Sequence, residues 1–96
     1  MVGSAGFSTG GAYYVSMVLS TSGTPYIAFQ DDTGSSKKTT VMKYTGSGAT
    51  GWEELGSGGF SDGKTIYTSL DIYNNVPYVA YCDTENSSKA TVMKYE

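Results

Sequence analysis

Carboxylates are the main side chains in this sequence that could support catalysis. The 96 residues include no histidine and no arginine, which excludes Ser–His–Asp and Cys–His nucleophile systems, the usual zinc sites and arginine clusters for carboxylate substrates. The single cysteine, Cys82, cannot form an internal disulfide and has no base candidate beside it in the sequence. We expect Cys82 to pack as a small apolar residue, and Lys43 and Lys94 to be solvated residues of matching strands.

Two acidic segments are candidates for a calcium site. Asp31 and Asp32 in one segment, and Asp83 and Glu85 in the other, offer the hard oxygen ligands that Ca²⁺ prefers in a flexible loop. Neither segment has the spacing of an EF-hand loop. Calcium is therefore the one cofactor that these residues suggest, and solvated turn carboxylates are the alternative.

A pair of carboxylates at a defined separation could also hydrolyse a glycosidic bond. The acidic side chains should lie in loops on one face of the molecule, where such a pair could form. However, Asp62 corresponds to Thr9, and Glu85 to Thr33, in the internal repeat described below. Because these carboxylates do not recur, we predict a protein without catalytic residues and keep a carboxylate-based glycosidase as the weaker alternative.

Nine tyrosines and one tryptophan indicate a binding function instead. Aromatic faces beside hydroxyl, amide and carboxylate groups suit sugars, and a weak site that is repeated gains avidity. Tyr14 and Tyr67 match at the start of two strands, and Asp62 and Lys64 precede the second of these. These four are the predicted ligand-binding residues, whereas Trp52 is expected to pack against its own sheet.

Charge and composition limit the kinds of partner and of fold that we expect for this chain. The formal net charge of −3 argues against nucleic acid. No apolar run approaches the ~20 residues of a membrane span, and the N-terminus lacks a charged, apolar signal sequence. Glycine, tyrosine, serine, threonine and valine favour strands joined by tight turns. A chain of this length buries a modest core, so without a disulfide or zinc site we expect self-association to stabilise it.

An internal repeat of about fifty residues covers nearly the whole chain, on a scale typical of solenoids, propellers and other arrays. The offset between matching segments falls from 53 to 52 to 51 along the chain, with the single-residue slips in loops. The matching segments are 2–10 with 55–63, 24–31 with 76–83, 35–37 with 87–89, and 40–44 with 91–95.

Each copy divides into short strands separated by turns. Residues 12–19 alternate between two sets of side chains, as the period of two in a strand requires. Ser22-Gly23 and Asn74-Asn75 suit tight turns, because glycine and asparagine tolerate positive φ. The expected strands are 12–19, 26–30, 40–44 and 51–56 in the first copy, and 65–73, 78–82 and 91–95 in the second.

Four strands in a repeat of this length predict a β-propeller blade, a unit that cannot bury both of its faces alone. The motifs W-x-x-L-G, G-F-S-x-G, P-Y-(I/V)-A-(F/Y) and T-V-M-K-Y resemble propeller repeats of secreted or surface bacterial proteins. The resemblance spans nearly all of the chain and implies an all-β fold of antiparallel four-stranded blades. It also implies an extracellular or cell-surface location. The signatures of WD40, kelch and sialidase propellers are missing.

The repeat predicts how the chain is divided. Residues 1–11 form a rim-strand stub and crossing loop, and residues 12–56 form a complete first blade. Residues 57–64 cross to a second blade, 65–96, that lacks its outer strand. Because the N-terminal residues match the missing strand, we expect head-to-tail closure between chains, with a six-bladed trimer favoured over an eight-bladed tetramer. A fragment of a longer propeller is the alternative origin, and it too would assemble.

The predicted function is a non-catalytic propeller module that forms a homo-oligomeric ring and binds carbohydrate on its loop face. Resemblance of fold does not choose a function, since propellers host many. A purely structural scaffold without a ligand of its own is the alternative.

Overall fold

The computed structural model describes residues 2–8, 10–32, 37–55, 64–84, 87 and 89–95. In these ranges the chain is all-β, as its composition predicts, and no described segment is a helix that could cross a membrane. The strands are β1 (Ala12–Leu19), β2 (Pro25–Asp31), β3 (Lys38–Tyr44), β4 (Trp52–Glu54), β5 (Thr65–Tyr73), β6 (Val76–Asp83) and β7 (Lys89–Lys94).

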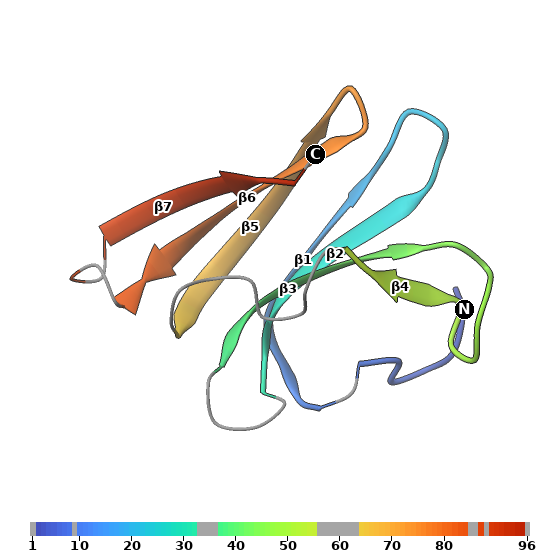
Figure 1. Ribbon diagram of the computed structural model, residues 1–96, viewed down its shortest axis with the longest axis horizontal. Helices are drawn as coiled ribbons and strands as arrows, with labels where there is room; N and C mark the ends of the chain where they lie inside the picture. Colours follow the sequence, from blue (N-terminus) through green and yellow to red (C-terminus); the bar gives the residue numbers. More distant parts are fainter. Residues whose placement is uncertain are drawn as a thin grey trace.

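The strands form two antiparallel sheets in chain order. The first sheet has the order β1-β2-β3-β4, and the described part of the second has the order β5-β6-β7. Figure 1 shows the sheets side by side, with β1 next to β5 and with β4 and β7 on opposite outer sides. The numbers of strands predicted for the two copies are therefore confirmed in the described residues.

The repeat in the sequence is also a repeat in backbone geometry. β1 is bulged between Tyr13 and Ser16, and β5 is bulged between Ile66 and Ser69, 53 positions later in both cases. A β-bulge places an extra residue in one strand and increases the local twist. The same irregularity at the same place is what two copies of one folding unit should produce.

Facing sides of the two sheets enclose the main apolar core. Alternate residues of each strand share one face, so buried side chains from both sheets can meet in a single cluster. β5 packs against β1 and β2 and contributes Leu70 to this cluster. The buried members are Tyr26, Ala28 and Val41 from the first sheet, and Leu70, Val79 and Tyr81 from the second.

The segment that precedes β1 lies beside β4 in the first sheet (Figure 1). The Ser4 amide donates to the Thr50 carbonyl at 2.9 Å, and the Trp52 indole donates to the Val2 carbonyl at 3.1 Å. Gly3, at φ 69°, permits this approach, because a Cβ there would lie 2.5 Å from the Thr50 oxygen. The segment therefore runs from the outer edge of the sheet to the start of its first strand.

The β1–β2 hairpin turns one residue earlier than the expected Ser22-Gly23. Its central residues are Thr21 and Ser22, because the Gly23 amide donates to the Ser20 carbonyl at 2.9 Å. Gly23 follows with φ 85°, as in a type I turn completed by a left-handed residue. The left-handed backbone explains the glycine, but that residue follows the turn and is not one of its central pair.

The β5–β6 hairpin turns through Asn74 and Asn75, as the sequence predicts. Their φ angles are 49° and 62°, and the flanking residues Tyr73 and Val76 pair with each other. Two left-handed residues between paired strands make a type I′ turn, whose twist matches that of the strands. Asparagine tolerates this conformation better than other residues with a side chain.

Asn75→Ala should lower the free energy of unfolding by about 1 kcal/mol, because alanine is strained at positive φ. Asn75→Gly should leave the stability unchanged or raise it, since glycine is preferred at this place. Urea denaturation followed by circular dichroism measures both changes. Thr21→Ala is the control, because Thr21 is a turn residue outside the left-handed region. Equal stability of the alanine and glycine variants would contradict the type I′ assignment.

Candidate functional site

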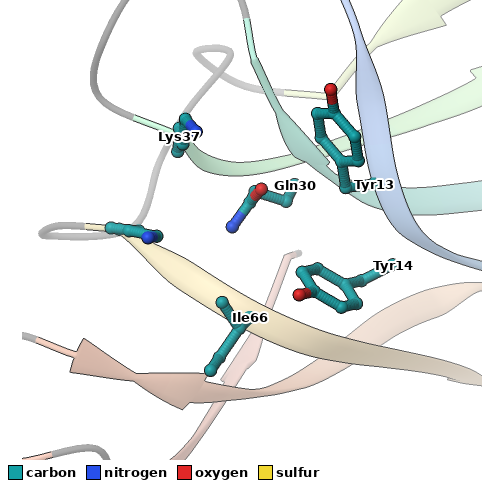
Figure 2. Close-up of a pocket in the computed structure, with 6 residues that line it drawn as sticks. Tyr13, Tyr14, Gln30, Lys37 and Ile66 are labelled. Carbon is teal, nitrogen blue, oxygen red and sulfur yellow. The ribbon is translucent and has the colours of Figure 1, made fainter.

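An open pocket of about 340 Å³ lies between the two sheets, at the end of the molecule where β1 and β5 begin. The start of each antiparallel strand lies beside the end of its neighbour, so side chains from several strands converge here. Figure 2 shows Gln30 at the centre of this group, with the other labelled residues around it. The pocket is lined by Tyr13, Tyr14, Gln30, Lys37, Lys64 and Ile66.

The bulge in β1 explains how two consecutive tyrosines can line the same pocket. Neighbouring residues of a regular strand point to opposite faces of the sheet. Tyr14 has a left-handed φ of 53° and lies in the irregular stretch between Tyr13 and Ser16. The Thr68 hydroxyl on β5 donates to the Tyr14 carbonyl and holds this backbone against the second sheet. A costly backbone conformation thus brings both rings to the pocket, as bulges beside functional sites often do.

A buried polar network joins the two sheets beside the pocket. The Gln30 side-chain amide donates to the Thr65 carbonyl, and the hydroxyls of Thr39 and Thr65 share a hydrogen bond. The Thr65 amide also donates to the Lys37 carbonyl at 3.1 Å. The side chains of Gln30, Thr39 and Thr65 are almost fully buried. Because a buried polar group is costly without a partner, this network specifies how the sheets meet at the pocket.

Two lysines give the pocket positive charge. The Lys37 ammonium lies 3.9 Å from the Asp32 carboxylate, and both side chains are partly exposed. This separation is longer than a hydrogen bond, and such a pair adds little to stability. The Lys64 carbonyl accepts hydrogen bonds from the Thr84 hydroxyl at 2.7 Å and the Thr84 amide at 3.3 Å. Both lysines therefore extend from backbone that is tied to another strand or loop.

Two of the four predicted ligand-binding residues, Tyr14 and Lys64, line this pocket together. Tyr14 is in β1 and Lys64 directly precedes β5, and the packing of β5 against β1 brings them to one place. The Tyr67 side chain and the whole of Asp62 lie outside the described residues. The prediction for those two positions stays a prediction.

Sequence reasoning missed Tyr13, Gln30, Lys37 and Ile66 as pocket residues. A usable signal was present at Gln30, a polar residue near the end of a strand that is otherwise mostly apolar. The repeat places Cys82 at the matching position of the second copy, so this amide belongs to one copy only. A polar residue that breaks a repeat on a buried strand must have a partner, and here the partner is across the sheet interface.

The suggested calcium ligands do not come together in the described part of the chain. Asp31 accepts a hydrogen bond from the Thr40 hydroxyl at 2.9 Å, and Asp83 accepts one from the Thr91 hydroxyl at 3.2 Å. The two aspartates join adjacent strands in separate sheets. Glu85 lies outside the described residues, and those that are described contain no group of three ionisable side chains suited to a metal.

Trp52 packs against its own sheet, as predicted. Its ring stacks on Phe7 with centroids 4.3 Å apart, and Tyr44 meets it edge-on at 5.7 Å. Cys82 is a half-buried free thiol in β6. The pocket lining contains neither residue.

Comparison with known proteins finds no family model, no curated protein and no solved structure that matches this chain. A functional assignment therefore depends on the repeat and on the geometry described above.

Thr65→Val should lower the free energy of unfolding by about 1–3 kcal/mol, because it removes one side of the hydrogen bond to the buried Thr39 hydroxyl. The double variant Thr39→Val/Thr65→Val should lower the free energy of unfolding by less than the sum of the two single variants, because either single substitution already removes the hydrogen bond between the two hydroxyls. Denaturant titration of the wild type and the three variants measures the coupling. Additive costs would show that the two hydroxyls do not interact.

Proposed function

We propose that this chain is a non-catalytic β-propeller module that assembles head to tail with copies of itself into a closed ring. On this proposal each sheet is one blade, and the contact between the two sheets of a chain is repeated between chains. The observation that supports it is a difference in exposure between matching residues of the two copies.

The first sheet exposes residues whose counterparts in the second sheet are buried. Met17 is 60% exposed, whereas Leu70, its counterpart 53 positions later, is 7% exposed. Leu19 is also exposed, while its counterpart Ile72 packs against the core cluster. The exposed side of β1 thus resembles the side of β5 that is buried between the sheets.

The second sheet exposes the complementary half of the same contact. Val92 is 65% exposed, whereas Val41, 51 positions earlier, is 2% exposed. Ala80 is partly exposed, while its counterpart Ala28 is fully buried. The outer side of the second sheet therefore resembles the side of the first sheet that β5 covers.

Two positions limit the size of the unpartnered patch. Phe29 is as well buried as its counterpart Tyr81, and Met42 is better buried than its counterpart Met93. The exposed apolar part of the first sheet is therefore centred on β1. A contact with another chain should be centred there as well.

The two exposed halves are complementary because each copies one side of an interface that already exists within the chain. Burying a valine, leucine or methionine side chain contributes about 1.5–3 kcal/mol. The sum over all the side chains buried in the contact must exceed the cost of the rotational and translational freedom that the chains lose on association. Contact between different patches on two chains is heterologous, and it forms a ring when the rotation between chains permits closure. Residues before β1, which in the single chain are hydrogen-bonded beside β4, would then have to leave that edge to extend the outer edge of β7 in the next chain.

A trimer with six blades is the ring that we favour, and a tetramer with eight blades is next. Propellers have about four to eight blades, so two sheets per chain permit either. Closure would also cover the free edges and faces that a two-blade unit exposes.

Carbohydrate binding is the second candidate function. The pocket supports it, because Tyr14 and Lys64 lie there with the Gln30 amide, and sugars bind to aromatic and polar groups of this kind. A scaffold without a ligand is the alternative. A glycosidase is less favoured, since Asp31 and Asp83 are hydrogen-bonded to threonines of their own sheets.

The native mass in solution should be three or four times the chain mass of 10.2 kDa, as light scattering or native mass spectrometry would measure. Met17→Lys and Val92→Lys should each reduce it to the mass of one chain without changing the circular dichroism spectrum, because each places a charge in an apolar contact. Thr21→Lys, at an exposed hairpin tip, is the matched control. A folded wild-type monomer would contradict the ring.

Mixing the two assembly variants tests whether the contact is head to tail. Each variant keeps one intact face, so the mixture should form a species of two chains, twice 10.2 kDa, that cannot grow further. A contact between two identical faces would not produce this species. Failure of the mixture to associate at any concentration where the wild type is a ring would count against the head-to-tail arrangement.

A further inference from the structure

We infer that the pocket between the two sheets binds a sugar that carries a carboxylate, of the uronic acid class, and that each chain holds one such site. This inference rests on the carbohydrate-binding part of the proposed function. It does not depend on the ring, because all the lining residues belong to one chain.

The charge of the pocket selects an anionic ligand. Lys37 and Lys64 are two of only six basic residues in a chain whose net charge is −3, and both line this one pocket. Asp32 lies 3.9 Å from the Lys37 ammonium and offsets one of the two positive charges. One positive charge therefore remains among these three groups. A lysine ammonium has three donors on a flexible stem, so each lysine can donate to a carboxylate in the pocket.

The other lining groups select a sugar ring over a bare anion. Tyr13 and Tyr14 are 50% and 42% exposed, and they offer apolar faces as well as phenolic hydroxyls. Gln30 adds an amide at the centre of the group (Figure 2). The volume of about 340 Å³ is at the lower end of the range for small-molecule pockets, which suits one sugar residue.

Hydrogen bonds within the chain hold several backbone groups around the pocket in place. The bulge at Tyr14 allows both tyrosine rings to line the pocket, and Gln30 is held by its bond to the Thr65 carbonyl. The carbonyls of Lys37 and Lys64 accept hydrogen bonds from Thr65 and Thr84. A site whose groups are already placed loses less conformational entropy on binding.

The repeat does not reproduce this site a second time. At the positions that match Lys64 and Gln30 stand Gly11 and Cys82. An equivalent pocket between two chains of a ring would therefore keep a single lysine, Lys89, and no amide. The full set occurs once per chain, between its own two sheets.

The test is a titration of the whole chain followed by the amide chemical shifts in NMR. Glucuronic acid should bind with one site per chain and shift the amides of the pocket strands. Glucose and the methyl ester of glucuronic acid should bind at least about ten-fold more weakly, because they lack the charge. Acetate should bind more weakly than glucuronic acid, because it lacks the ring. Equal binding of glucose and glucuronic acid, equal binding of acetate, or no binding of glucuronic acid would overturn the inference.

Variants of the lysines provide the second part of the test. Lys37→Gln and Lys64→Gln should each weaken glucuronic acid binding by about five-fold, as loss of a partly solvated charge does. Lys89→Gln, at the position that matches Lys37 in the second copy, is the matched control and should not change the affinity. Raising the salt from about 50 mM to about 500 mM should weaken binding, since screening acts on exposed charges. An effect of Lys89→Gln as large as that of Lys37→Gln would contradict the single site.

The assembly variant Met17→Lys separates this inference from the ring. Met17 does not line the pocket, so a monomeric Met17→Lys chain should bind glucuronic acid as the wild type does. A wild-type ring that binds no uronic acid would leave the assembly proposal intact and reject the site. A monomeric wild type that binds uronic acid would reject the ring and support the site.

Discussion

Face-to-face packing of the two sheets is the contact on which the rest of this structure depends. A single sheet of three or four short strands is at best marginally stable, because it leaves one apolar face in water. Here β5 covers β1 and β2, and Val41, Leu70 and Val79 become buried between the sheets. The same packing places the starts of β1 and β5 side by side and so forms the pocket between them. Core and candidate site are therefore two ends of one interface.

The interface changes in character along its length. Its middle is apolar, whereas its loop end contains the buried network of Gln30, Thr39 and Thr65. Apolar surfaces tolerate sliding, but hydrogen bonds between buried groups require one register, since an unmatched buried partner is costly. The polar end thus determines how the sheets meet, and it does so where Tyr14 adopts its left-handed backbone. Precise placement and local strain occur together at the site where a ligand would need them.

When one folding unit is repeated along a chain, the outer sides of the two copies resemble the two sides of the contact between them. Leu70 and Val41 are buried against each other's sheets, so their counterparts Met17 and Val92 are exposed on the two outer sides. Ring closure would give those sides the same environment that their counterparts already have. The two copies nevertheless differ at the pocket, because the second copy has Cys82 where the first has Gln30, and the first copy has Gly11 where the second has Lys64. On these proposals, assembly would require the two copies to be alike, whereas the single ligand pocket would require them to differ.

The order of residues alone determined the strands, their antiparallel pairing and the asparagine turn. These depend on local preferences and on a period of two, both of which can be read along the chain. It also predicted the division into four strands and three, because the repeat marks each matching element. The turn before Gly23 begins one residue earlier than the sequence predicts, because several turn types accept glycine at neighbouring positions. Only the tertiary structure decided that Tyr13 and Tyr14 line one pocket together with Gln30, Lys37 and Lys64. A bulge reverses the alternation that sequence reasoning assumes, and contacts across the sheet interface join residues more than thirty positions apart, as Gln30 and Thr65 show.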